Sequence, residues 1–175
     1  MTKPPSCCSM SNYTLRTYAD SDAARVNELA LAAFEQFRSQ YSDWPAMASA
    51  IGRMSALADS GEIIVAECDE RVIGAVAYIP PGHPKAAYFD LSWPIIRMLV
   101  VDPASRGAGV GRALTEECIS RARRDGSRVI ALHSSPIMTV ALPMYLRMGF
   151  QLVQNAPPIY GVPYAVYLKY LDSWA

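Results

Sequence analysis

The stretch LVVDPASRGAGVGR, residues 99–112, is the part of this sequence that says most about its fold. It begins in the most apolar strand candidate of the sequence, residues 95–101, and a continuous apolar run of this kind is typical of a central strand. A glycine-rich turn follows the strand. Residues 110–124 then show one apolar face at helical spacing, and Gly126 ends the pattern. The stretch therefore predicts a buried strand that passes through a tight turn directly into a helix.

The turn between this strand and this helix has the features of an anion-binding site. The N–H groups in the first turn of a helix have no partner within the helix, and the helix dipole adds partial positive charge there. Gly107, Gly109 and Gly111 let the backbone approach a phosphate, and Arg106 and Arg112 can add charge-assisted hydrogen bonds. A P-loop is excluded because no Gly-Lys-Ser/Thr follows, and a Rossmann fingerprint is excluded because Arg112 stands where its third glycine belongs. A plain flexible turn remains the alternative.

Hydrophobic periodicity along the rest of the chain predicts a single α+β domain over residues 11–175, after a loose leader at residues 1–10. The expected architecture is a mixed, mostly antiparallel sheet of about six to seven strands flanked by four helices. A loop with prolines and a tyrosine should precede the last strand, and Pro143 should kink or shorten the last helix. The predicted strands are 13–18, 62–67, 72–79, 95–101, 128–133, 150–153 and 163–170, and the predicted helices begin near Asp20, Asp43, Val110 and Ile137.

Composition limits the function classes. The 175 residues carry 16 basic and 16 acidic side chains, a balance that argues against a dedicated nucleic-acid binder. No run approaches the roughly 18 apolar residues of a membrane span, and no signal-like segment follows the N-terminus, so a cytoplasmic protein is expected. The four cysteines, Cys7, Cys8, Cys68 and Cys118, have no zinc-site or disulfide-framework spacing. We therefore expect reduced thiols and no metal.

Two motifs together resemble the GNAT superfamily of N-acetyltransferases. The run Leu99-Val100-Val101-Asp102-Pro103-x-x-Arg106-Gly107-x-Gly109-Val110-Gly111 is similar to its acetyl-CoA motif, whose core is Arg/Gln-x-x-Gly-x-Gly/Ala. After a further helix and strand, Ala141-x-x-Met144-Tyr145-x-x-x-Gly149-Phe150 resembles the Ala-x-x-Leu-Tyr-x-x-x-Gly-Phe of the same superfamily. The resemblance covers residues 13–170.

This resemblance implies a central strand that splays from its neighbour near a bulge at residues 98–101, with the pantetheine arm of acetyl-CoA in the gap. Backbone groups of Leu99 and Val101 would pair with that arm, and the amides of residues 107–112 would hold the pyrophosphate. Met138 stands where the superfamily often has an asparagine that contacts the cofactor, which puts that one contact in doubt. The implied cofactor-binding residues are Met98, Leu99, Val100, Val101, Arg106, Gly107, Ala108, Gly109, Val110, Gly111, Arg112 and Ala141.

The reaction that the resemblance implies is direct attack of a primary amine on the acetyl carbonyl. Tyr145 is the candidate catalytic residue, because its phenol would hydrogen-bond or protonate the departing thiolate; a merely packed tyrosine is the alternative. The central strand lacks the carboxylate that many members of the superfamily carry there. The general base therefore stays open among Asp90, His83, His133, Glu62 and water.

The acceptor is expected to be a small-molecule amine, and a homodimer is possible. Few carboxylates in the predicted pocket segments disfavour polyamines and aminoglycosides, while Arg97 could face either an acidic substrate group or a structural partner. A non-catalytic sensor or partner module that binds coenzyme A or acetyl-CoA is the second hypothesis. Aromatic residues are expected to wall the acceptor pocket, namely Phe34, Phe37, Tyr41, Trp44, Tyr88, Phe89, Trp93 and Tyr160.

Overall fold

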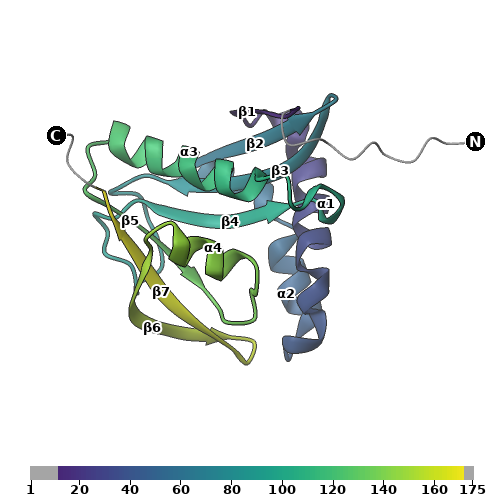
Figure 1. Ribbon diagram of the computed structural model, residues 1–175. Helices are drawn as coiled ribbons and strands as arrows, with labels where there is room; N and C mark the ends of the chain where they lie inside the picture. The colour runs from purple at the N-terminus through teal and green to yellow at the C-terminus, as the bar shows by residue number, and fades with distance from the viewer. Residues whose placement is uncertain (1–11, 172–175) are drawn as a thin grey trace, which may run out of the picture.

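The computed structural model describes residues 12–171, which form one sheet with helices packed on it (Figure 1). The sheet has seven strands in the order β1-β2-β3-β4-β5-β7-β6, and neighbours are antiparallel except β4 and β5, which are parallel. The expected α+β fold with a mixed, mostly antiparallel sheet is therefore confirmed. The strands are β1 Thr14–Thr17, β2 Glu62–Cys68, β3 Arg71–Ile79, β4 Ile95–Val101, β5 Val129–Ser134, β6 Gln151–Ile159 and β7 Val162–Tyr170. The longer helices are α1 Ala23–Phe34, α2 Trp44–Ile51, α3 Val110–Arg124 and α4 Ala141–Arg147.

The helices cover the sheet in pairs, one pair on each face. Val110 and Leu114 of α3 share a buried cluster with Ile64 of β2, and α4 joins the same cluster. Val26 of α1 and residues of α2 share a second cluster with Ile63, the neighbour of Ile64 on β2. Adjacent residues of a strand point to opposite faces, so the two clusters lie on the two sides of the sheet. Within the described part of the chain, none of the helices is long and apolar enough to cross a membrane.

Helix α2 begins directly after Asp43, as predicted, but ends earlier than the helical spacing of Met47, Ile51, Met54 and Ala58 suggests. The Asp43 carboxylate accepts a hydrogen bond from the Ala46 N–H at 3.1 Å, and Pro45 occupies the first turn. The helix stops at Ile51, and the apolar residues that follow are carried by a 3-10 segment, Met54–Asp59.

The loop predicted before the last strand is wrong, because residues 155–159 continue β6. Strands β6 and β7 form a long hairpin, which turns at Tyr160 and Gly161 with φ values of 42° and 80°. Pro157 and Pro158 have no N–H and therefore suggest a break in the strand. They are tolerated because β6 lies at the edge of the sheet, where those donors need no partner, and the strand register shifts at this point.

The last helix, predicted to begin near Ile137, begins only at Ala141, which agrees with the shortening expected from Pro143. Pro143 is the third residue of α4, where its missing N–H has no partner to lose. A helix that started a turn earlier would place the proline ring against a preceding carbonyl. Gly149 ends α4 with a φ of 94°, as the sequence predicts.

Helix α3 lies close to β3 because Gly74 has no side chain. A β-carbon at this position would stand 2.8 Å from Val110 Cγ1 and 3.1 Å from Leu114 Cδ1. Both of these side chains are completely buried, so neither has room to move aside. The contact fixes the first turns of α3 relative to the sheet.

Two of the four cysteines fall within the described residues. Cys118 on α3 is a buried free thiol. Cys68 at the end of β2 is disulfide-bonded, so the expectation of reduced thiols is wrong for this residue. Cys7 and Cys8 lie outside the described residues, as does the whole of the predicted leader at residues 1–10.

Candidate functional site

Strands β4 and β5 separate in the middle of the sheet. Their pairing register contains one position, Ile95 opposite Ala131, beside which the Ala131 N–H donates to the Pro94 carbonyl at 3.0 Å. Beyond this point β4 continues beside β3 only, and its other edge has no strand partner among residues 12–171. The splay predicted at the central strand is therefore confirmed. It leaves free main-chain N–H and C=O groups facing the opening, which an extended ligand can pair with.

A β-bulge lies in β4 beside the opening. Ala75 of β3 faces Val100, whereas Ala77 faces Arg97, so β4 uses three steps where β3 uses two. Met98 absorbs the extra residue with a φ of 56°, which is unusual for a residue other than glycine. A bulge of this kind bends its strand and re-aims the side chains around it.

The glycine-rich turn places a set of backbone donors at the start of α3. Gly107 and Gly109 have φ values of 84° and 79°, which only glycine adopts without strain. The Ala113 N–H donates to the Gly109 carbonyl at 3.0 Å, so the N–H groups of residues 110–112 precede the first bond of this helix. A β-carbon at Gly107 would meet nothing within 4 Å, so this side of the turn is open. The turn has the geometry of an anion site.

The two arginines of the turn stay at the surface. Arg112 pairs with Glu116 at 3.0 Å, and the Arg106 guanidinium lies 3.5 Å from the Ala33 carbonyl. An exposed pair such as Arg112–Glu116 contributes about 0–1 kcal/mol, so either arginine can turn toward an anion at small cost. Ala108 is buried and offers its backbone only.

A cavity of about 540 Å³ continues from the opening between β4 and β5. It is lined by four of the predicted residues, Met98, Leu99, Ala141 and Tyr145, whereas the Val100 side chain packs with α1 and that of Val101 with α3. A β-carbon on Gly111 of α3 would lie 3.7 Å from Leu99 Cδ2, so the anion turn and the cavity are neighbours. Within residues 12–171, no group of three or more His, Cys, Asp or Glu stands as a metal-binding cluster.

Tyr145 presents its hydroxyl to this cavity. The ring is 5% exposed and stacks edge-on against Phe150 at 5.6 Å between centroids. Its hydroxyl makes no hydrogen bond within the described chain, and no fully buried side-chain oxygen there lacks a partner, so the oxygen must reach the cavity. Burial raises the pKa of the phenol, which keeps it protonated and able to donate at neutral pH.

His133 is the one candidate base that lines the cavity. It stands among aromatic rings, with Tyr164 at 5.1 Å, Tyr88 at 5.7 Å and Phe89 at 6.0 Å between ring centroids. Burial, with a further contribution from the positive charge of Arg97, lowers the pKa of His133 to about 4. A neutral imidazole with so low a pKa is a poor acceptor for the proton of an ammonium group.

We predict that His133 makes the free energy of unfolding fall as the pH is lowered. Its native pKa of about 4 lies below the ordinary 6.5, so between these values the unfolded chain binds a proton that the native protein excludes. Stability is complete above about pH 6.5, and at pH 5 the wild type should have lost about 2 kcal/mol. Urea unfolding of His133→Gln should lack this loss. His83→Gln, at the exposed second histidine, is the control that should keep it; an equal loss in all three proteins would contradict the assignment.

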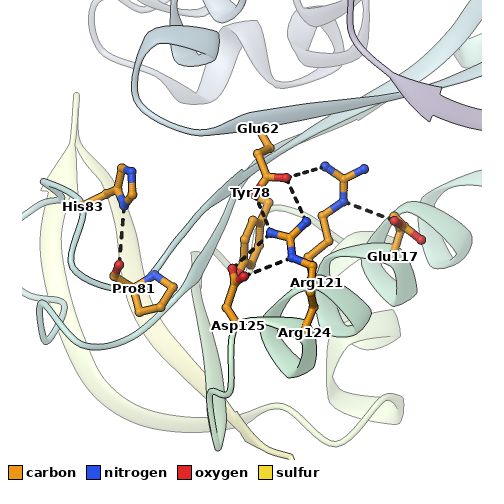
Figure 2. A network of polar contacts seen from close by, with 8 residues as sticks. All are labelled: Glu62, Tyr78, Pro81, His83, Glu117, Arg121, Arg124 and Asp125. Carbon is orange, nitrogen blue, oxygen red and sulfur yellow. Dashed lines mark hydrogen bonds and ion pairs between the residues drawn. The ribbon is translucent and has the colours of Figure 1, made fainter.

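The other three candidate bases stand away from the cavity. His83 and Asp90 are exposed on the loop after β3, where the His83 ring lies 3.4 Å from the Pro81 carbonyl. Glu62 bridges Arg121 and Arg124 of α3 at 2.9 and 2.8 Å (Figure 2). The hydrogen bond from Arg124 lowers the pKa of Glu62. Glu62 is therefore part of a polar network between β2 and α3.

Replacing Glu62 should destabilise the fold and leave catalysis unchanged. Glu62→Gln removes the countercharge of Arg121, whose side chain is only 13% exposed, and we expect a loss of about 1–2 kcal/mol in the free energy of unfolding. Chemical denaturation measures this loss, while kcat at a temperature where both proteins are folded should stay constant. Glu35→Gln, in an exposed pair with Arg38, should change stability by less than about 0.5 kcal/mol. A fall in kcat without a loss of stability would contradict this prediction and make Glu62 a candidate general base again.

The walls of the cavity differ from the aromatic pocket that the sequence predicts. Phe34 and Tyr160 line it, but the other six predicted aromatic residues pack in the core or on loop 80–94. Sequence reasoning missed Tyr164 and Arg53. Tyr164 lies in an almost continuously apolar strand that gives no pattern to single it out, and Arg53 follows α2 without any signal. The remaining wall is apolar and includes the methionines Met47, Met54, Met98 and Met138.

The sequence is similar to one known protein family and to curated relatives that are named as acetyltransferases. Residues 23–150 match the acetyltransferase (GNAT) family. The chain is 33% identical to N-acetyltransferase 8F1 of Rattus norvegicus over 52% of its length and 40% of the relative's. It is 32% identical to a mycothiol acetyltransferase of Cellulomonas flavigena over 60% of its length and 32% of the relative's. The chain thus spans less than half the length of these curated relatives.

The fold is also similar to solved structures. One is a GNAT family acetyltransferase from Elizabethkingia anophelis with acetyl-CoA bound, at a TM-score of 0.65. The match covers 92% of this chain and 99% of that one at 16% sequence identity, so it bears on the fold alone.

Proposed function

The chain belongs to the acetyltransferase (GNAT) family, and on that premise we propose that it transfers an acetyl group from acetyl-CoA to a primary amine of a small molecule. One observation carries this proposal. The unpaired edge of β4 and Tyr145 border one cavity, and the open first turn of α3 lies next to it, because a β-carbon on Gly111 would stand 3.7 Å from Leu99 Cδ2.

The residues of this space fit acetyl-CoA. Backbone donors at residues 110–112 would bind the pyrophosphate, and the free edge of β4 would pair with the amides of the pantetheine arm. Met98, Leu99 and Ala141 would line the passage into the cavity. Bound there, acetyl-CoA supplies the activated acetyl group and a thiolate leaving group.

The chain's own residues then position an amine and stabilise the leaving thiolate. The cavity holds the acceptor nitrogen near the carbonyl carbon, where a C–N bond forms as the C–S bond breaks. Tyr145 donates a hydrogen bond to the departing sulfur. An ammonium group with a pKa near 10.4 needs about 4–5 kcal/mol to lose its proton at neutral pH. His133, with a pKa of about 4, is too weak a base to hold this proton, so we propose that the ammonium group releases it to bulk solvent through water.

Thiol release from acetyl-CoA, followed across a panel of primary amines, tests the proposal. We expect release that depends on both the amine and the enzyme, with an N-acetylated product identified by mass spectrometry. Calorimetry with coenzyme A should be run alongside. Binding of coenzyme A without thiol release for any amine would overturn the proposal and favour the non-catalytic sensor.

A further inference from the structure

Two arginines project into the cavity without a countercharge. Arg97 comes from β4, one residue before the bulge, and Arg53 comes from the segment that follows α2. Neither guanidinium makes a hydrogen bond or an ion pair with any of residues 12–171, whereas Arg16, Arg25, Arg121 and Arg124 all do. Both side chains are exposed to solvent and line the cavity, so their guanidinium groups are available to an anion that enters it.

The rest of the cavity surface offers nothing that neutralises them. Its described lining contains no aspartate or glutamate, and its other polar side chains are uncharged at neutral pH. The remaining wall is apolar, with Met47, Met54 and Leu57 from the α2 side. The site thus combines net positive charge with an apolar body, a combination that suits an anionic group on an apolar molecule.

We propose that the acceptor is an amine that also carries a carboxylate on an apolar body, and that Arg97 binds this carboxylate with Arg53 adding positive charge. This inference rests on the proposed acetyl transfer, and it narrows the acceptor class. Guanidinium is suited to carboxylates because its planar N–H groups match both oxygens. The same charge opposes a second ammonium group, so diamines and polyamines should be poor acceptors.

The charge of Arg97 acts inside the site. Burial lowers the pKa of His133 and raises that of Tyr88; the charge of Arg97 adds to the first shift and opposes the second, so the guanidinium lies within electrostatic range of both residues of this aromatic cluster. A carboxylate bound to Arg97 would therefore lie beside this cluster. The acceptor nitrogen could then point along β4 toward the bulge at Met98 and the hydroxyl of Tyr145.

The direct test compares acceptors that differ in the carboxylate alone. L-Phenylalanine and 2-phenylethylamine share their ring and their primary amine. We expect kcat/KM to be higher for the acid by about tenfold or more, the range of one charged hydrogen bond. Measurement at two pH values separates this preference from the different acidities of the two ammonium groups.

Substitutions of the arginines show which side chain causes the preference for the acceptor with a carboxylate. Arg97→Gln should bring the ratio of the two kcat/KM values close to one through a higher KM for the acid, with the KM for acetyl-CoA unchanged. Arg53→Gln should reduce the ratio by a smaller factor. Arg38→Gln removes an exposed arginine that does not line the cavity, and it should keep the wild-type ratio.

A binding measurement keeps the inference testable if turnover is absent. N-acetyl-L-phenylalanine and N-acetyl-2-phenylethylamine, titrated by calorimetry in the presence of coenzyme A, should bind with at least a tenfold difference in Kd in favour of the acid. The absence of thiol release with any amine would refute acetyl transfer and leave this comparison intact. Equal affinities, or a ratio unchanged in Arg97→Gln, would overturn the assignment of the carboxylate to Arg97.

Discussion

Tyr145→Phe should lower kcat by about a hundredfold, within the range by which a positioned proton donor accelerates a reaction. The hydroxyl makes no hydrogen bond within residues 12–171 and reaches the cavity, so the substitution deletes a group that contacts reactants and little else. The stack on Phe150 is retained. Steady-state kinetics should show the loss in kcat, with the KM for acetyl-CoA within about twofold and the Tm unchanged.

A second tyrosine separates chemistry from packing in this experiment. Tyr167 belongs to the same buried cluster as Tyr145 but does not line the cavity. Tyr167→Phe should therefore keep the wild-type kcat. An unchanged rate in Tyr145→Phe would remove the proposed role, and an equal loss in both variants would attribute the effect to packing.

Gly74→Val should destabilise the protein by about 2–3 kcal/mol and weaken the binding of coenzyme A. The new side chain would collide with Val110 and Leu114 of α3, and its β-carbon would stand 3.3 Å from the Val100 carbonyl oxygen. Relief requires α3 to move away from β3. Because the backbone donors of the anion site lie in the first turn of α3, the movement displaces them. Chemical denaturation measures the first effect and calorimetry with coenzyme A the second.

Gly61→Ala is the matched control for the effect on binding. Its β-carbon would lie 2.4 Å from the Tyr78 carbonyl oxygen and 2.7 Å from Ile79 Cδ1, at the other end of β3. The variant should be destabilised at least as strongly as Gly74→Val. Its affinity for coenzyme A should stay close to that of the wild type under conditions where it is folded. Equal losses of affinity in the two variants would show that general instability, and not the place of α3, is responsible.

The elements that could be predicted well are those whose sequence pattern is strong over their whole length. Residues 95–101 and 110–124 coincide with β4 and α3, because a wholly apolar strand, two glycines at positive φ and a periodic helix leave few alternatives. The β6–β7 hairpin was mispredicted because Pro157 and Pro158 are read as breaks, and only the position of a strand at the sheet edge makes them acceptable.

The site was predictable where it consists of backbone and unpredictable where it consists of distant side chains. The turn at residues 107–112 and the tyrosine at 145 follow from local motifs. The cavity wall brings together Arg53, Arg97 and Tyr164 from three separate elements, and their proximity depends on packing that no local pattern specifies. The low pKa of His133 likewise depends on rings that other segments contribute.

The opening between β4 and β5 gives this sheet two inner edges in addition to its outer ones at β1 and β6. The edge of a strand binds a partner through main-chain N–H and C=O groups, and nearly every residue type carries both. On the proposed binding mode, recognition along β4 depends on the path of the main chain more than on the identity of its side chains. Apolar exchanges at Leu99 or Val101 should consequently be nearly silent for ligand affinity.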